Sequence, residues 1–222
     1  MTNGFQPQEI FVLYCISGNI DKLREYYGSN KDMIDISANN EEAFRWSCYN
    51  GHLSIAKWLL NIKQTIDISA NNDQAFLWAC SEGRLLILEW LLSIKPSISM
   101  SVQKEKAFTY ACYRGQLDVA KWLIEVIPSI DITAENHFAI KCATTYKHFS
   151  IVQWLSDLYI TRNIRNWLFH NLENNDLSVQ CLICHDYQAT YVKSQCGHTY
   201  CRECITRWLI QNNTCPYCRN NI

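Results

Sequence analysis

The sequence predicts a mainly α-helical chain in which a solenoid of helical repeats precedes a small domain folded around two zinc ions. Three observations predict this fold class. The chain resembles itself at a shift of 32 residues, apolar residues recur at helical spacing within each unit, and eight cysteine and histidine residues cluster near the carboxyl end. With 222 residues, 48% hydrophobic content and a formal net charge of -1, the composition is that of an ordinary globular chain.

The repeat is visible in columns of identical or similar residues. One column holds Ala43, Ala75, Ala107 and Ala139, and another holds Trp58, Trp90, Trp122 and Trp154. A period near 33 residues is typical of a solenoid, because each unit buries its apolar face only against its neighbours. The predicted repeat array covers 1–160, with units at about 9–33, 34–65, 66–97, 98–129 and 130–160.

Within a unit, two helical patterns are separated by a turn such as Gly51 and His52. The segment Gly51–Leu60 closely resembles the second helix of an ankyrin repeat, and Gly83–Leu92 and Gly115–Ile124 repeat it. The Thr-Pro-Leu-His tetrad of that family is replaced by Glu42–Arg45, and the glycines of its hairpin are absent. The resemblance therefore implies the helix pair and leaves the projecting hairpin open. Divergent repeats of this kind are similar to those of giant DNA viruses, which would place the protein in a host cell.

The two ends of the array differ from its middle. Lys22 and Glu25 occupy the positions of Ile55 and Trp58, which predicts a polar amino-terminal cap. After Tyr159 the period fails. We expect a capping helix and a polar linker over 161–178, with helical spacing at Ile160, Ile164, Trp167 and Leu168, before the zinc domain at 179–222.

The carboxy-terminal domain carries eight candidate zinc ligands, in the order CxxC, CxH, CxxC, CxxC: Cys181, Cys184, Cys196, His198, Cys201, Cys204, Cys215 and Cys218. Zinc prefers four such ligands in a tetrahedron, so eight ligands predict two structural Zn²⁺. The spacing alone permits either sequential or interleaved pairing. Fewer than fifty residues surround the ligands, so folding of this domain should depend on the metal.

Three cysteines, a histidine and four more cysteines resemble the RING finger family. The resemblance implies interleaved sites, with Cys181, Cys184, Cys201 and Cys204 on one zinc and Cys196, His198, Cys215 and Cys218 on the other. His185 adjoins a ligand, but eight are complete without it, so we expect a surface histidine.

The same resemblance implies a RING-type ubiquitin ligase. RING domains dock a ubiquitin-conjugating enzyme through residues that correspond here to Ile183, Trp208 and Pro216. Arg219 has the place of the cationic residue that bridges ubiquitin and that enzyme. No residue looks like a nucleophile or general base, so this chain would act by positioning its partners. The alternative is a non-catalytic zinc-containing adaptor or decoy.

The repeats are expected to recruit the protein substrate. A row of residues that differ between units is a candidate substrate-binding surface: Arg45, Leu77, Thr109 and Lys141. Residues on a surface without a function also vary between units, so the row is either a binding surface or an ordinary exposed surface. The column Cys15, Cys48, Cys80 and Cys112 and the tryptophan column are both predicted to be core.

Other partner classes are disfavoured. The finger has a net charge of +2 from Lys193, Arg202, Arg207 and Arg219 against Asp186 and Glu203, too little for nucleic acid. No apolar run approaches the roughly 20 residues that span a membrane. The zinc sites and the remaining cysteines need reduced thiols, so we expect the protein in the cytoplasm or the nucleus. Nothing in the sequence indicates an oligomeric state.

Overall fold

The computed structural model describes residues 5–100, 103–170, 172–174, 180–186, 190–194, 196–209, 212 and 214–220. The chain divides into two compact units, 1–152 and 153–222, and each is described by itself. Among the described residues, no helix is both long enough and apolar enough to cross a bilayer.

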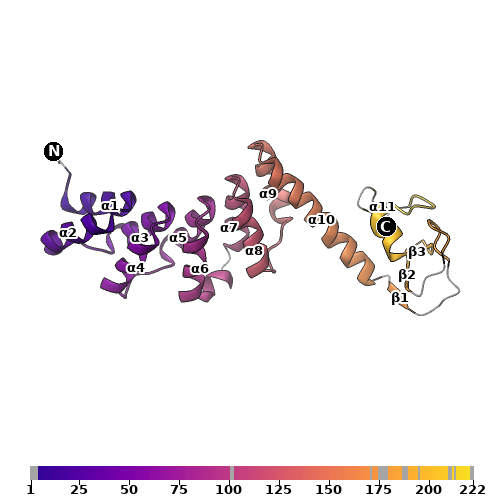
Figure 1. The fold of residues 1–222 in the computed structure, drawn as a ribbon, viewed down its shortest axis with the longest axis horizontal. Helices are drawn as coiled ribbons and strands as arrows, with labels where there is room; N and C mark the ends of the chain where they lie inside the picture. The colour runs from indigo at the N-terminus through magenta and orange to yellow at the C-terminus, as the bar shows by residue number, and fades with distance from the viewer. Residues whose placement is uncertain are drawn as a thin grey trace. The chain divides into compact units, whose positions relative to one another are not determined.

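The first unit is a stack of helix pairs (Figure 1). Successive first helices pack against one another, so α1 contacts α3, α3 contacts α5, α5 contacts α7 and α7 contacts α9. Two short 3-10 helices, η1 and η2, follow α2 and α6. The pairs are α1 (Pro7–Ser17) with α2 (Ile20–Asn30), α3 (Ala38–Asn50) with α4 (Leu53–Ile62), α5 (Ala70–Ser81) with α6 (Leu85–Ile94), and α7 (Lys104–Tyr113) with α8 (Leu117–Val126). Helix α9 (Ala134–Thr145) follows, α10 (Phe149–His170) begins in this unit and continues into the second, η1 is Lys31–Met33 and η2 is Pro96–Met100.

Four of the turns that join two helices of the stack are built on a glycine with positive φ, as at Gly18 (φ 82°), and between α9 and α10 the equivalent residue is Lys147 (φ 60°). A Cβ on Gly18 would lie 2.4 Å from the His52 ring of the next unit. The His52 ring in turn bonds through Nε2 to the Ile16 carbonyl at 2.9 Å. The His52 ring of one unit thus bonds a carbonyl at the end of the preceding unit's first helix. Position 18 must be glycine because its φ is positive and because the His52 ring lies too close for a Cβ.

Each connection between pairs leads into the next first helix, and in α3, α5 and α9 the first turn departs from right-handed helical geometry. Asn39, Asn40 and Glu41 have left-handed φ values of 53°, 56° and 63°, a conformation that asparagine tolerates better than most residues. No strand occurs in the described ranges 5–100 and 103–170, so the projecting ankyrin hairpin is not formed there. Buried isoleucines anchor these connections, at Ile34, Ile66, Ile98 and Ile130.

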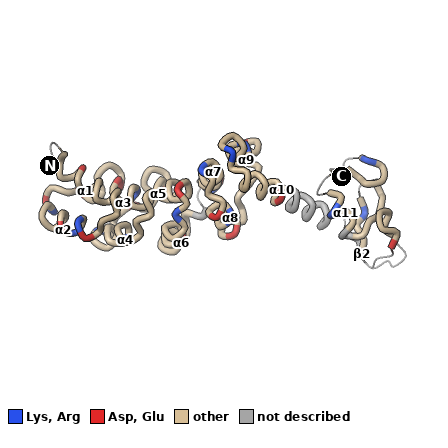
Figure 2. The backbone as a smooth tube through the Cα atoms, turned by 45° about the horizontal axis from the view of Figure 1, so that its top comes forward, with Lys and Arg blue, Asp and Glu red and all other residues tan. Residues whose placement is uncertain are grey.

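The cysteine column is core, as predicted: Cys15, Cys48, Cys80 and Cys112 are each 0% exposed. The tryptophan column is only half-buried. Trp58 still packs edge-on against Tyr27 of the preceding unit, with ring centroids 5.5 Å apart. Basic and acidic residues are interspersed along the described helices of this unit (Figure 2).

The segment 161–178 differs from the expected capping helix and linker. Helix α10 runs unbroken to His170, since no glycine or proline in 160–170 would end it. Its end is followed by strand β1 (Leu172–Asn174). Asn171 and residues 175–178 of the expected linker lie outside the described residues.

The zinc domain contains a three-stranded antiparallel sheet in the order β1, β2 (Thr190–Lys193), β3 (Thr199–Cys201). Val192 is opposite Leu172 on one side and Tyr200 on the other. Helix α11 (Arg202–Leu209) follows β3 directly. Its apolar residues Ile205, Trp208 and Leu209 recur at helical spacing.

Candidate metal centre

The eight predicted ligands form two groups, and the pairing is interleaved. Cys181 and Cys184 come together with Cys201 and Cys204, whereas Cys196 and His198 come together with Cys215 and Cys218. Strand β3 explains the crossing. His198 precedes the strand and serves one group, while Cys201 ends it and serves the other.

Both groups have the size and donors that zinc requires. Within each group all four ligand atoms lie within 4.8 Å of one another. A tetrahedral zinc with bonds of about 2.3 Å to sulfur and 2.0–2.1 Å to nitrogen places two sulfurs about 3.8 Å apart and a sulfur and a nitrogen about 3.6 Å apart. The Sγ atoms of Cys184 and Cys201 are 3.9 Å apart, and His198 Nδ1 lies 3.2 Å from Cys196 Sγ. Two structural Zn²⁺ sites are therefore confirmed, each with all four protein ligands.

The first and last CxxC pairs form equivalent loops, which we call the first knuckle (181–186) and the second knuckle (215–220). In the first, His185 N–H donates to the Cys181 carbonyl at 2.9 Å. In the second, Arg219 N–H donates to the Cys215 carbonyl at 2.9 Å. Both His185 (φ 64°) and Arg219 (φ 60°) are left-handed. His185 is exposed and outside the ligand groups, as predicted.

Three of the finger thiols, Cys181, Cys196 and Cys215, have lowered pKa values, whereas the pKa values of Cys184, Cys204 and Cys218 are raised. Burial raises the pKa of Cys181, but backbone N–H groups of Cys184, Cys201 and Ile183 outweigh it and lower that pKa to about 7. The Ser194 hydroxyl, 3.1 Å from Cys196 Sγ, leads the interactions that lower the pKa of Cys196 to about 7. Ser194 is 3% exposed and was not predicted, because its sequence position carries no ligand signal.

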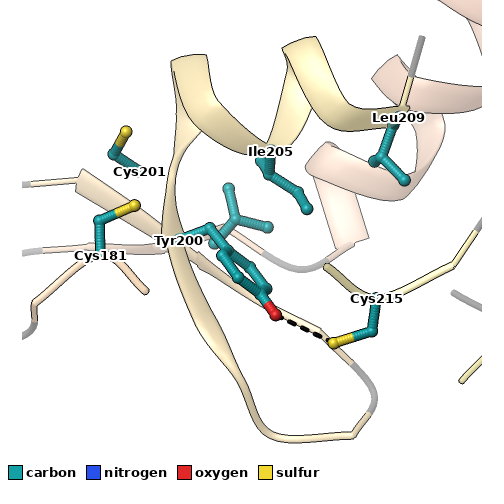
Figure 3. Close-up of a cluster of buried hydrophobic side chains, with 7 residues drawn as sticks. Cys181, Tyr200, Cys201, Ile205, Leu209 and Cys215 are labelled. Carbon is teal, nitrogen blue, oxygen red and sulfur yellow. Dashed lines mark hydrogen bonds between the residues drawn. The ribbon is translucent and has the colours of Figure 1, made fainter. Parts of the chain in front are cut away.

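The finger has a small core between its two metal groups (Figure 3). Tyr200 is fully buried beside Ile205 and Leu209. Its hydroxyl is 2.9 Å from Cys215 Sγ and donates to that sulfur when it is a thiolate. The core is therefore tied directly to a metal ligand.

The predicted docking residues lie on the knuckles and on α11. Ile183 is 39% exposed, and its N–H donates to Cys181 Sγ at 3.4 Å. Trp208 is half-buried against the core, and its Nε1 donates to the Thr214 carbonyl at 2.7 Å. Pro216 is half-buried. Tyr217 was not among the predicted docking residues. It is 69% exposed and has the same place in the second knuckle as Ile183 in the first.

Arg219 is exposed and makes no side-chain hydrogen bond or ion pair with any residue that the structure describes. The second knuckle fixes its backbone and leaves its guanidinium in solvent. A guanidinium presented in this way is able to bind carbonyl or carboxylate groups of a partner.

Two of the four residues in the predicted substrate-binding row are buried, contrary to the exposure expected of them. Thr109 is half-buried and Lys141 is exposed, but Arg45 is 8% exposed and Leu77 is 4% exposed. Leu77 belongs to α5, which packs between α3 and α7. The residue at this position is therefore buried in some units and at the surface in others, so its variation does not by itself mark a binding surface.

Arg45 is buried because its guanidinium completes the left-handed turn that precedes it. Nε donates to the Asn40 carbonyl at 2.8 Å, and one terminal nitrogen donates to the Asn39 carbonyl at 2.7 Å. The other terminal nitrogen contacts Gln74 Oε1 of the next unit. The guanidinium also lies 5.5 Å from the centre of the Trp78 ring. An arginine with these partners is structural.

Comparison with known families agrees with both parts of the architecture. Residues 179–219 match the family described as "Ring finger domain", and residues 11–103 match the family described as "Ankyrin repeats (3 copies)". The stack described above continues beyond the ankyrin match, through the pair α7 and α8 to α9.

Curated relatives match over the finger. The chain is 40% identical over 47 residues to the Postreplication repair E3 ubiquitin-protein ligase RAD18 of Candida albicans, which is 21% of this chain and 12% of the relative. It is 38% identical over 47 residues to RING finger protein 151 of Mus musculus, or 21% and 20% of the two chains. It is 39% identical over 62 residues to Polycomb group RING finger protein 3 of Xenopus tropicalis, or 27% and 23%.

The aligned region thus spans less than a quarter of each of these relatives. It coincides with the part of the chain that carries both zinc groups. The chain accordingly joins ankyrin repeats to a carboxy-terminal RING finger with two Zn²⁺ sites.

Proposed function

We propose that the chain is a RING-type ubiquitin-protein ligase whose finger holds a ubiquitin-charged conjugating enzyme while the repeats recruit a protein substrate. The carrying observation is the interleaved eight-ligand finger, which presents an exposed Ile183 on one knuckle and an exposed Arg219, unpaired among the described residues, on the other. The RING match and a relative named as an E3 ubiquitin-protein ligase support it.

The chain would contribute position, with no covalent step of its own. The described finger thiols are ligands, and the fully buried repeat thiols Cys15, Cys48, Cys80 and Cys112 have pKa values raised by burial, so neither set offers a free thiolate. In the transfer, a substrate lysine amine attacks the thioester carbon on the conjugating enzyme. The C–S bond breaks, the amide C–N bond forms, the amine loses a proton and the enzyme's thiolate leaves. Holding both reactants in a reactive orientation lowers this barrier.

Ile183 and Arg219 have separable roles in this proposal. Ile183 would bury apolar surface against the conjugating enzyme and so contribute to docking affinity. Arg219 would hydrogen-bond ubiquitin and the enzyme together and so stabilise the reactive orientation. The substrate would bind the repeats at the accessible members of the predicted row, Thr109 and Lys141, since Arg45 and Leu77 are buried. Such a protein would work where thiols stay reduced, in the cytoplasm or nucleus.

The test is a discharge assay across a panel of conjugating enzymes charged with ubiquitin. Arg219→Ala should lower discharge about tenfold or more, equivalent to about 1.4 kcal/mol of lost orientation, while leaving binding of the uncharged enzyme intact. Ile183→Ala should weaken binding, so that a higher enzyme concentration restores the rate. Lys193→Ala, which removes another exposed cation of the finger, is the matched control. If the intact chain stimulates no enzyme of the panel, the chain is an adaptor or decoy.

A further inference from the structure

An aromatic column on the first helices of the repeats is interrupted at its last member. Trp46, Trp78 and Tyr110 occupy equivalent positions on α3, α5 and α7, and the equivalent residue on α9 is Cys142. Between α3 and α5, the rings of the column pack directly against each other. The Trp46 and Trp78 ring centroids are 5.0 Å apart, and Tyr49 packs edge-on against Trp78 at 5.6 Å.

Where the column is interrupted, a pocket opens between α7 and α9. It has a volume of about 470 Å³, within the range of sites that bind small molecules or side chains. Four of its eight lining residues are aromatic, and Cys142 lies where the fourth ring of the column would be. The residues that shape it are Tyr110, Tyr113, Phe138, Lys141, Cys142 and Tyr146.

The walls of this pocket are accessible. Phe138 is 46% exposed and Tyr146 is 52% exposed, although both are large apolar rings. The Tyr113 and Tyr146 rings meet edge-to-face with centroids 4.4 Å apart, so the far wall is held in place by ring packing. Exposed aromatic residues around a preformed pocket are typical of surfaces that bind another protein.

The charge at the pocket selects among partners. Lys141 is the only charged residue among those that line it, and it makes no ion pair with the described residues. In the adjoining groove Lys106 lies 5.8 Å from the centre of the Tyr110 ring. That groove also holds Glu135, and Glu105, which pairs with Lys104 at 3.7 Å. An acidic group beside the pocket itself would meet Lys141 without an opposing carboxylate.

We propose that this pocket binds a segment of a partner protein in which a large aromatic side chain is flanked by acidic residues. The aromatic ring would complete the column in the space left by Cys142, and a flanking carboxylate would pair with Lys141. Only the identification of that partner as a ubiquitylation substrate rests on the proposed function. The binding itself does not.

Three labelled peptides added to the full zinc-loaded chain test the proposal by fluorescence anisotropy. The probes are blocked pentapeptides with the sequences EEWEE, EEAEE and KKWKK. We expect EEWEE to bind at least about tenfold more tightly than either of the others, because each control lacks one of the two required features. Equal affinity for EEWEE and EEAEE, or no binding of EEWEE up to millimolar concentrations, would overturn the proposal.

Variants locate the binding. Tyr146→Ala should weaken EEWEE binding about tenfold, whereas Phe149→Ala removes a 71% exposed aromatic residue that does not line the pocket and should change nothing. Lys141→Glu should weaken EEWEE and strengthen KKWKK. Lys121→Glu, an equal change of net charge at an exposed position on α8, should do neither. If each variant behaved like its control, the binding would be nonspecific and the pocket assignment wrong.

Filling the pocket from within is the complementary test. Cys142→Trp restores the column and should abolish EEWEE binding while the helical circular dichroism signal is kept. If this variant fails to fold, the comparison of Tyr146→Ala with Phe149→Ala still tests the proposal. Concentration-dependent self-association that Tyr146→Ala removes, without peptide binding, would assign the pocket to a second copy of the chain and overturn the proposal. Ubiquitin discharge without peptide binding defeats this inference alone, and peptide binding without discharge defeats only the ligase proposal.

Discussion

Cysteine residues occupy the interiors of both parts of this chain, yet they do opposite chemistry. In the repeats, Cys15, Cys48, Cys80 and Cys112 are fully buried, and burial raises their pKa values, that of Cys15 to about 12. In the finger, hydrogen bonds outweigh burial at Cys181 and lower its pKa to about 7, while burial raises the pKa of Cys204. The difference is in the donors around each sulfur. Helix packing surrounds the repeat thiols with apolar groups, while each knuckle directs N–H groups at its sulfur.

The repeats and the finger also differ in what stabilises them. The repeats have a continuous apolar core and inter-unit bonds such as His52 Nε2 to the Ile16 carbonyl. The finger has only a small core around Tyr200, tied to a metal ligand through the Tyr200 hydroxyl. Folding of the repeats should therefore be independent of metal, whereas folding of the finger should require it.

Zinc removal should separate the two parts most strongly. A chelator should unfold the finger, because each structural site contributes on the order of 10 kcal/mol to folding, and most of the helical signal should remain. Metal analysis should give two zinc ions per chain before treatment. The change Cys196→Ala should act like the chelator on the finger, and Cys48→Ala should leave both ions in place. Loss of the entire helical signal on chelation would show that the two parts fold as one cooperative unit.

Alkaline pH should weaken the repeats through their buried thiols. Above the ordinary thiol pKa of 9.0 the unfolded chain releases a proton that folded Cys15 keeps until about pH 12. The free energy of unfolding should therefore fall between these values by up to about 1.4 kcal/mol per pH unit for each such thiol. Urea unfolding of the helical signal at pH 8 and pH 10 measures the slope. Cys15→Ala should make the slope shallower, and an unchanged slope would contradict this account.

Gly115→Ala should destabilise the repeats by about 1–3 kcal/mol. Gly115 has φ 78°, and an added Cβ would lie 2.7 Å from the His148 ring, which bonds through Nε2 to the Tyr113 carbonyl at 2.9 Å. Gly28→Ala is the matched control, because nothing lies within 4 Å of the new Cβ in helix α2. That change should stabilise by about 0.5–1 kcal/mol. Denaturant midpoints compare the two, and equal losses would rule out the turn geometry as the cause.

The smallest expected effect concerns the equivalent left-handed residues of the two knuckles. His185→Gly and Arg219→Gly should each stabilise the zinc-loaded finger by about 1 kcal/mol, since glycine adopts positive φ without strain. Only Arg219→Gly should lower ubiquitin discharge. Thermal unfolding and the discharge assay, run on both variants, separate the backbone role of Arg219 from its proposed bridging role. Equal discharge by the two variants would leave Arg219 with the backbone role alone.

Local patterns allowed much of this molecule to be predicted. The period of the repeats, the helix pairs and the cysteine core follow from spacings within about 33 residues, and the eight ligands follow from their order in one short stretch. The glycine turns were predicted because Gly51 and its equivalents interrupt a helical pattern. These features depend on the propensities and burial of near neighbours, which the sequence displays directly.

Only the tertiary structure decided the features that depend on residues far apart in the chain. Spacing left the pairing of the knuckles open, although the RING resemblance implied it, and strand β3 placed His198 and Cys201 in different metal groups. The burial of Arg45 required Gln74 from the next unit. The pocket at Cys142 required the rings of Tyr110 and Phe138 from two different repeats. A column position records which residue is present, but the space around it is set by neighbours that the fold brings together.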